Sequence, residues 1–199
     1  MSRIPTLGTR AGGILAHVTS LPDGHGVGDL GPPARRFLDF LAGAGQRWWQ
    51  MLPVGPAGEG FSPYSSTFAG DPVLISLEDL LRDGLMSRGG IPAKRDRRAH
   101  RVDSPLVTGA KEVALRRAFE RSTRMRSRRR FHDFCEANAA WLDDFALFRI
   151  LKRLHPGRPW YAWPEAQRRR NPATLDSLRT REREEAEFVR FEQFVFQLQ

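Results

Sequence analysis

The stretch from Gln46 to Ser76 constrains the fold of this chain more than any other. It begins with a short apolar run, Trp48 to Leu52, which stops at Pro53. A long segment rich in Gly, Pro, Ser and aromatic residues follows, before a second apolar run at Pro72–Ile75. In α/β enzymes, a rigid buried strand that leads into a long loop commonly builds a binding surface. The stretch therefore predicts a buried strand followed by a functional loop.

A disordered surface segment is the alternative interpretation of this loop. Long loops without secondary structure are uncommon in compact domains, and those that occur tend to be functional. The loop also contains Phe61, Tyr64 and Phe68, whereas freely solvated segments are poor in aromatic residues. The composition therefore favours an ordered loop with a role.

An earlier segment completes a strand–helix–strand pattern with the first apolar run. Gly12–Val18 is typical of a short buried strand, and a loop rich in Gly and Pro follows it. Pro32–Ala42 has the pattern of a helix with proline in its first turn. Gln46–Leu52 then predicts the second strand. Two strands joined by a helix run parallel, so the loops that follow them should lie on the same side of the sheet.

The remainder of the chain is predicted to be largely helical. Expected helices cover Leu77–Leu85, Lys111 to about Met125, Arg130–Leu154, and Asn171 to Gln199 with at most a short break. Their expected core positions are Val113, Leu115, Ala118 and Phe119; Trp141, Phe145, Phe148 and Leu151; and Phe188, Phe191, Val195 and Leu198. Asp143 and Asp144 are expected in solvent. The apolar pattern still continues at Gln199 and only two strands are evident, so we expect a fragment of a longer protein.

The net charge of +9 raises the hypothesis of a nucleic-acid partner. Much of the excess lies in residues 94–130, including the cluster Arg121–Arg130. We favour a solvated helix face, because this cluster has no interleaved aromatic residues and no recognised nucleic-acid motif. The single Cys135 cannot form an internal disulfide and is expected to be a small buried filler rather than a catalytic thiol.

No apolar run is long enough to span a membrane, and the first residues lack the apolar core of a secretory signal. We therefore expect a cytoplasmic protein without a membrane partner.

Several motifs, taken in order, resemble those of the amylomaltases, the bacterial 4-α-glucanotransferases. The resemblance is closest at Gly13–Pro22 with Gly26–Gly31, Trp49–Pro56, and Ser62–Tyr64 with Phe68–Pro72. It continues through Val102-Asp103, Arg116–Phe119, Trp160, Trp163-Pro164 and Glu185–Gln199. The resemblance therefore covers essentially the whole chain.

The resemblance implies an α/β fold, the N-terminal part of a (β/α)8 TIM barrel with a largely helical insertion subdomain. Residues 1–76 would supply the first strands and the donor-site loop, residues 77–175 the insertion, and residues 176–199 a helix leading back to the barrel. The implied chemistry is retaining glycosyl transfer between maltooligosaccharides or other α-1,4-glucans, without a metal or cofactor. In the family, the nucleophilic Asp and the acid/base Glu correspond to positions beyond Gln199. This chain alone should therefore be inactive, and its partner should be the missing C-terminal part of the barrel.

The family's donor site corresponds to three residues of this chain. Tyr64 would lie along the sugar beside the scissile bond, Ser62 would bond to the same ligand, and His17 would lie at the end of the first strand. Each has a structural alternative: Tyr64 can be a loop-packing ring, and His17 can be a strand-end residue. If the chain catalysed alone, Glu59 with Asp71 would be the carboxylate pair, which the resemblance disfavours. A glucan-binding protein without catalytic activity is a further alternative.

Overall fold

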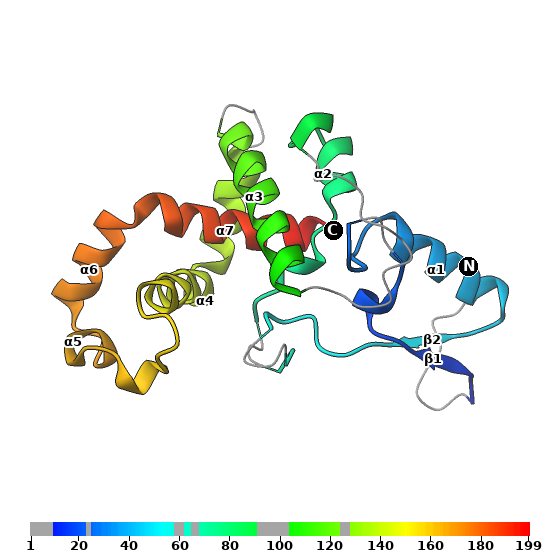
Figure 1. Ribbon diagram of the computed structural model, residues 1–199, viewed down its shortest axis with the longest axis horizontal. Helices are drawn as coiled ribbons and strands as arrows, with labels where there is room; N and C mark the ends of the chain where they lie inside the picture. Colours follow the sequence, from blue (N-terminus) through cyan, green and yellow to red (C-terminus); the bar gives the residue numbers. More distant parts are fainter. Residues whose placement is uncertain (1–9, 23–24, 58–61, 65–67, 91–103, 124–127) are drawn as a thin grey trace. The chain divides into compact units, whose positions relative to one another are not determined.

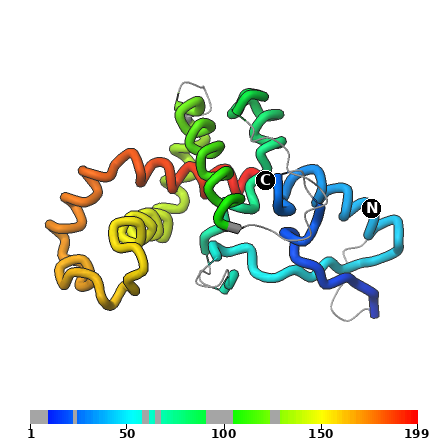
Figure 2. Tube along the Cα trace, in the orientation of Figure 1, coloured from blue at the N-terminus to red at the C-terminus, as the bar shows by residue number. Residues whose placement is uncertain are grey.

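The computed structural model describes residues 10–22, 25–57, 62–64, 68–90, 104–123 and 128–199. The chain divides into two compact units, one of residues 1–121 with Gln199 and one of residues 122–198 (Figures 1 and 2). The two units are defined by which residues of this chain contact one another. The domain boundaries predicted at residues 76 and 175 refer to the complete barrel, so they stay a prediction. No helix in the described part of the chain is long and apolar enough to cross a membrane.

Where the structure describes it, the first unit combines two short strands with three α-helices. Its elements are β1 (Gly13–Leu15), α1 (Pro32–Gly43), β2 (Trp48–Gln50), α2 (Leu77–Arg82) and α3 (Ser104–Ser122). Among the described residues, short 3₁₀-helices lie at Val18–Ser20, Pro72–Leu74 and Arg88–Gly90.

The regular secondary structure described in the second unit is all helical. It contains α4 (Arg128–Leu154), α5 (Glu165–Arg168), α6 (Pro172–Arg181), α7 (Arg183–Leu198) and a 3₁₀-helix at Trp160–Ala162. The expected C-terminal helix is interrupted once, at Glu182, between α6 and α7.

The predicted strand–helix–strand unit is confirmed. β1 and β2 pair in parallel, with Gly13 opposite Trp48 and Leu15 opposite Gln50. Gly45 adopts a positive φ of 71° after α1, a conformation that favours glycine, and the chain turns there into β2. The sheet formed by the described residues has two strands, so it does not close into a barrel.

The expectation that these strands are buried is wrong for this chain. Ile14 is 41% exposed, Leu15 68% and Trp48 40%. A sheet residue is buried only when other elements cover its face, and two strands cannot cover their own faces. On one side, the Trp49 ring packs edge-on against Phe37 of α1 with 5.0 Å between ring centroids, which accounts for the smaller exposure of Trp49.

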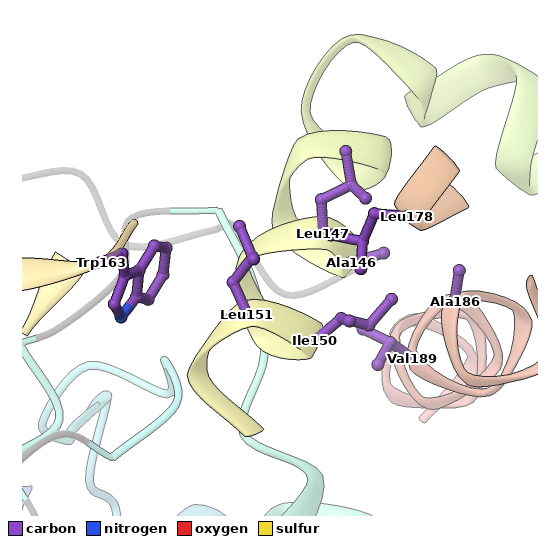
Figure 3. Close-up of a cluster of buried hydrophobic side chains, with 8 residues drawn as sticks. All are labelled: Ala146, Leu147, Ile150, Leu151, Trp163, Leu178, Ala186 and Val189. Atoms are coloured by element: carbon purple, nitrogen blue, oxygen red, sulfur yellow. The ribbon is translucent and has the colours of Figure 1, made fainter. Parts of the chain in front are cut away.

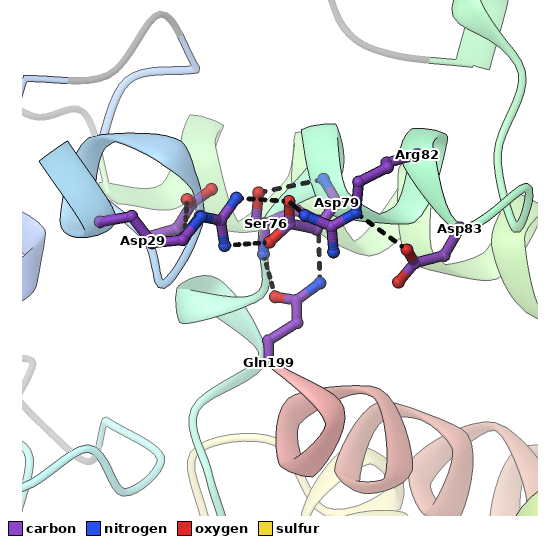
Figure 4. Close-up of polar contacts among 8 residues, drawn as sticks. Asp29, Ser76, Asp79, Arg82, Asp83 and Gln199 are labelled. Atoms are coloured by element: carbon purple, nitrogen blue, oxygen red, sulfur yellow. Dashed lines mark hydrogen bonds and ion pairs between the residues drawn. The ribbon is translucent and has the colours of Figure 1, made fainter. Parts of the chain in front are cut away.

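Buried polar groups hold α2 in the first unit (Figure 4). Ser76 caps the helix and accepts a hydrogen bond from the Asp79 N–H at 3.3 Å. Arg35 donates two hydrogen bonds, 2.7 and 2.8 Å long, to the Asp79 carboxylate, and this interaction raises the pKa of Arg35. The Gln199 side chain accepts from the Ser76 N–H at 2.6 Å and donates to the Ser76 carbonyl at 3.1 Å. A side chain at Gly31 would place Cβ 2.6 Å from Cβ of Ser76, so this close approach requires glycine.

In the second unit, α4 packs against α7 through a face that overlaps the predicted stripe only in part, at Leu151 and the partly buried Phe145. Figure 3 shows Ala146, Leu147 and Ile150 directed towards Leu178 of α6 and towards Ala186 and Val189 of α7. Of the predicted stripe on α4, Leu151 is 5% exposed and belongs to this core, whereas Phe148 is 42% exposed. The predicted stripe on α7 is confirmed for Phe188, Phe191 and Val195, while Leu198 is 43% exposed.

The prediction placed mainly aromatic residues of α4 in the core, whereas the contact between α4 and α7 is made mainly by smaller aliphatic side chains. Ala146 and Ile150 lie one turn apart and allow α7 to approach closely, because neither is as bulky as an aromatic ring. On α3 the predicted core positions Leu115, Ala118 and Phe119 are confirmed, whereas Val113 is 52% exposed and Ala114 is buried instead.

Two further expectations for the second unit have clear outcomes. Asp143 is half-buried, whereas Asp144 is exposed as expected, and both form ion pairs, at 2.9 Å with Arg190 and 2.6 Å with Arg170. Cys135 is partly buried, and burial raises its thiol pKa to about 11. The thiol therefore stays protonated at neutral pH, which agrees with a packing role.

The core face of α4 can be tested with two truncations on one helix. We expect Ile150→Ala to lower the free energy of unfolding by about 2–5 kcal/mol, because a fully buried side chain leaves a cavity. Phe148→Ala should cost less than half as much, since its ring is part-exposed. Denaturant unfolding measures both values. A larger loss for Phe148→Ala would show that the predicted aromatic stripe is the true core face.

Candidate functional site

The carboxyl ends of the two strands lie together in the first unit. The Ala16 N–H donates to the Gln50 carbonyl at 3.0 Å, which extends the ladder one residue beyond β1. The Trp49 indole N–H donates to the Ala16 carbonyl at 2.7 Å. These bonds place His17 beside the start of the loop that follows β2. The two loops predicted to share one side of the sheet therefore begin at the same edge.

Asp71 closes the base of the second loop. Its N–H donates to the Val54 carbonyl at 2.8 Å. Its two carboxylate oxygens accept from the Val73 N–H at 2.9 Å and from the Ala57 N–H at 3.1 Å. One side chain thus joins residues before and after the loop, and it also caps the 3₁₀-helix that starts at Pro72. The sequence did not predict this role, although a polar residue directly before a proline is a recognised helix-start signal.

Tyr64 and Ser62 lie within the loop that Asp71 closes. The Tyr64 side chain is 71% exposed, so it is not a buried packing ring in this chain. Ser62 is half-buried, and Phe68 is 75% exposed. Exposed aromatic rings on a closed loop offer apolar faces to a ligand, and the Tyr64 hydroxyl can donate or accept a hydrogen bond. Glu59 and Phe61 lie outside the described residues.

His17 occupies a partly buried position after β1. Burial lowers the pKa of its imidazole, and the nearby Asp71 carboxylate opposes this shift without reversing it. The imidazole is therefore neutral at pH 7. Its Nδ1 is buried, and no hydrogen-bond partner for it occurs among the described residues. A neutral imidazole can donate from one nitrogen and accept at the other, which suits either a strand-end support or contact with a hydroxyl group.

The acidic residues described near this edge have structural roles. Asp29 is 1% exposed and forms a 2.9 Å ion pair with Lys111. Both oxygens of Asp71 accept backbone N–H groups, as described above. Asp23 and Glu59 lie outside the described residues. A nucleophilic carboxylate needs an oxygen directed at the substrate, and Asp71 does not offer one, so the geometry counts against Glu59 with Asp71 as a catalytic pair.

The basic cluster shows no arrangement typical of a nucleic-acid site among its described residues. The Arg121 guanidinium donates to the Gly84 carbonyl at 2.8 Å, and Arg129 and Arg130 are exposed. Arg124 and Arg126 lie outside the described residues. The solvated helix face that we favour for Arg121–Arg130 stays a prediction.

The chain is similar to a known protein family and to several known proteins. A profile of the family described as 4-alpha-glucanotransferase matches residues 16–199. The chain belongs to the 4-α-glucanotransferase family.

Known 4-α-glucanotransferases match along nearly the whole chain but extend well beyond it. The enzyme of Thermus thermophilus is 43% identical over 194 residues, which cover 94% of this chain and 38% of the relative. The enzyme of Synechocystis is 38% identical over 194 residues, again 38% of its length. The structure of an amylomaltase from Streptococcus agalactiae in complex with acarbose is similar with a TM-score of 0.86 and 29% identity, and the match covers 96% of this chain and 39% of that one. This chain therefore spans about two-fifths of the relatives it matches.

The partly buried His17 predicts a pH dependence of stability. Its folded-state pKa lies below the ordinary value of about 6.5, so the unfolded state binds more protons between these two values. The stabilisation is thus fully present above pH 6.5 and is lost as the pH falls through the lowered pKa. Melting temperatures measured from pH 8 to 5 should fall more steeply for the wild type than for His17→Gln. Parallel curves for the two proteins would show that His17 does not contribute.

Proposed function

We propose that this chain supplies the donor-site part of a 4-α-glucanotransferase that acts on maltooligosaccharides and related α-1,4-glucans. The observation that carries the proposal is the exposed Tyr64, held on a closed loop at the carboxyl edge of the strands in a chain that matches the family from residue 16 to residue 199. Tyr64, Ser62 and His17 are the proposed sugar contacts. The amylomaltase from Streptococcus agalactiae, solved with acarbose, supports a maltooligosaccharide-like ligand.

The proposed reaction is a retaining double displacement. One carboxylate attacks the anomeric carbon while a second protonates the leaving sugar, and a sugar hydroxyl then resolves the glycosyl-enzyme. Both carboxylates would come from beyond this chain, because the described acidic residues at this edge serve structural roles. Within this division, the present residues bind and orient the sugar next to the scissile bond. No metal or cofactor is required by this chemistry.

The exposed strands support a partner that completes the barrel. Side chains that should lie inside a barrel are open to solvent, with Leu15 68% and Leu52 40% exposed. Unpaired strand edges and exposed apolar side chains favour association with other strands. We therefore propose that further strands of a (β/α)8 barrel cover β1 and β2, and that the chain without them is inactive and poorly soluble.

The remaining features of the proposal follow the family arrangement. Residues 1–76 would form the first barrel strands and the donor-site loop, residues 77–175 the helical insertion, and residues 176–199 the helix leading back to the barrel. The proposed location is cytoplasmic.

A chimaera tests the proposal directly. Residues 1–199 would replace the matching N-terminal segment of the Thermus thermophilus enzyme, to which they are 43% identical. We expect the chimaera to release glucose from maltotriose and to form longer maltooligosaccharides, whereas the isolated chain does neither. Transfer by the isolated chain would place the carboxylates within residues 1–199 and overturn the proposal. A well-folded but inactive chimaera that still binds acarbose would favour the glucan-binding protein without catalytic activity.

Two exposed rings on one loop provide a matched test of the sugar contact. In the chimaera, Tyr64→Ala should raise KM for maltotriose about tenfold, corresponding to about 1.4 kcal/mol of lost binding. Phe68→Ala removes a ring of similar exposure and should leave KM within about twofold. Tyr64→Phe separates the ring from the hydroxyl. Equal effects of Tyr64→Ala and Phe68→Ala would contradict a specific role for Tyr64.

A further inference from the structure

A buried ion pair joins α3 to the loops of the candidate site. Lys111 is 2% exposed, and its ammonium group donates to Oδ2 of Asp29 at 2.9 Å and to the Ile75 carbonyl at 2.7 Å. Removing both charges from water is costly, and a buried pair is weak grounds for inferring added stability. Its position therefore calls for a role other than general stabilisation.

One end of this pair holds the loop that follows β1. Oδ1 of Asp29 accepts the Gly31 N–H at 3.0 Å, while the neighbouring Gly28 N–H donates to the Thr19 carbonyl at 3.2 Å. Thr19 lies in the 3₁₀-helix Val18–Ser20, whose last N–H donates to the His17 carbonyl at 2.9 Å. Lys111 is thus connected through Asp29 to the backbone that carries His17.

The other end holds the segment that closes the second loop. Ile75 follows the 3₁₀-helix Pro72–Leu74 and donates its N–H to the Pro72 carbonyl at 3.1 Å. This short helix starts on Asp71, whose side chain binds the Val73 and Ala57 N–H groups. The Leu30 N–H also donates to the Leu74 carbonyl at 2.9 Å, so the two loop bases are in direct contact.

We propose that Lys111 is a positioning residue that sets the spacing between the two loops carrying His17 and Tyr64. A single ammonium group binds both loop bases at once, so neither can shift without breaking a buried, charge-assisted hydrogen bond. The expected consequence, that the loop spacing determines how tightly the sugar is held, rests on the proposed function. The rate of the chemical step should change little when Lys111 is replaced, because that step belongs to carboxylates elsewhere in the barrel.

The test needs a variant that folds. Lys111→Met alone leaves the Asp29 charge buried and unpaired, which can prevent folding. The double variant Lys111→Met with Asp29→Asn removes both charges, and the amide oxygen introduced by the second substitution can still accept the Gly31 N–H. The double variant therefore loses the hydrogen bond from Lys111 to the Ile75 carbonyl and leaves no unpaired charge in the interior. Leu41→Ala on α1 is the control, because Leu41 is 4% exposed in the same unit and has no part in these connections.

Amide hydrogen exchange on the 199-residue chain reports on the loop directly. In the double variant, the Ala57, Asp71 and Val73 amides should exchange at least about tenfold faster than in the wild type. The variant loses the hydrogen bonds of the Lys111 ammonium group, and hydrogen bonds to charged groups contribute more to stability than bonds between neutral groups. In Leu41→Ala, the exchange of these three amides should not increase more than that of the other amides of the same variant. Unchanged exchange in the double variant, or an equal effect of Leu41→Ala, would overturn the proposal.

The chimaera then separates positioning from general destabilisation. Well below the melting temperature, the double variant should raise KM for maltotriose about tenfold with kcat changed less than about threefold. Leu41→Ala should change neither constant at a comparable loss of melting temperature. An unchanged KM in an active double variant would refute the positioning role. Failure of the proposed function can be told apart from failure of this proposal. If the parent chimaera is inactive, the proposed function fails, and the exchange measurement on the 199-residue chain still decides the role of Lys111.

Discussion

The parallel pairing of β1 and β2 is the constraint on which the candidate site depends. Because the strands run in the same direction, their carboxyl ends lie at one edge, and both loops of the site begin there. The Trp49 indole strengthens this edge through its bond to the Ala16 carbonyl and its contact with Phe37. The helix α1 between the strands thus brings His17 close to a loop that starts much later in the chain.

The described carboxylates near the site edge bind backbone N–H groups and basic side chains. Asp71 satisfies two N–H groups across a loop, Asp79 binds two arginines beside the start of α2, and Asp29 pairs with the buried Lys111. An ionised carboxylate only accepts hydrogen bonds, so it suits the free N–H groups at loop bases and helix starts. This use of acidic residues explains how a chain with several carboxylates near the site edge can still lack a catalytic pair among the residues described there.

The two units differ in how far their cores are complete. In the second unit, α4, α6 and α7 bury a continuous set of aliphatic side chains around Ile150. In the first unit, the strands expose apolar side chains that the described helices do not cover. The proposed barrel would account for this difference, because strands in a barrel obtain much of their burial from neighbouring strands.

The sequence by itself determined the parallel unit, the largely helical remainder and the family. These follow from local signals: Pro32 at a helix start, the period of α7, and motifs in a set order. The start of both loops at one strand edge also followed, because strand direction fixes where the loops begin. Only the tertiary structure decided the buried face of α4, the exposure of Ile14 and Leu15, and the pairing of Lys111 with Asp29. Each depends on contact between residues distant in the chain, and periodicity within one element carries no information about the partner it meets.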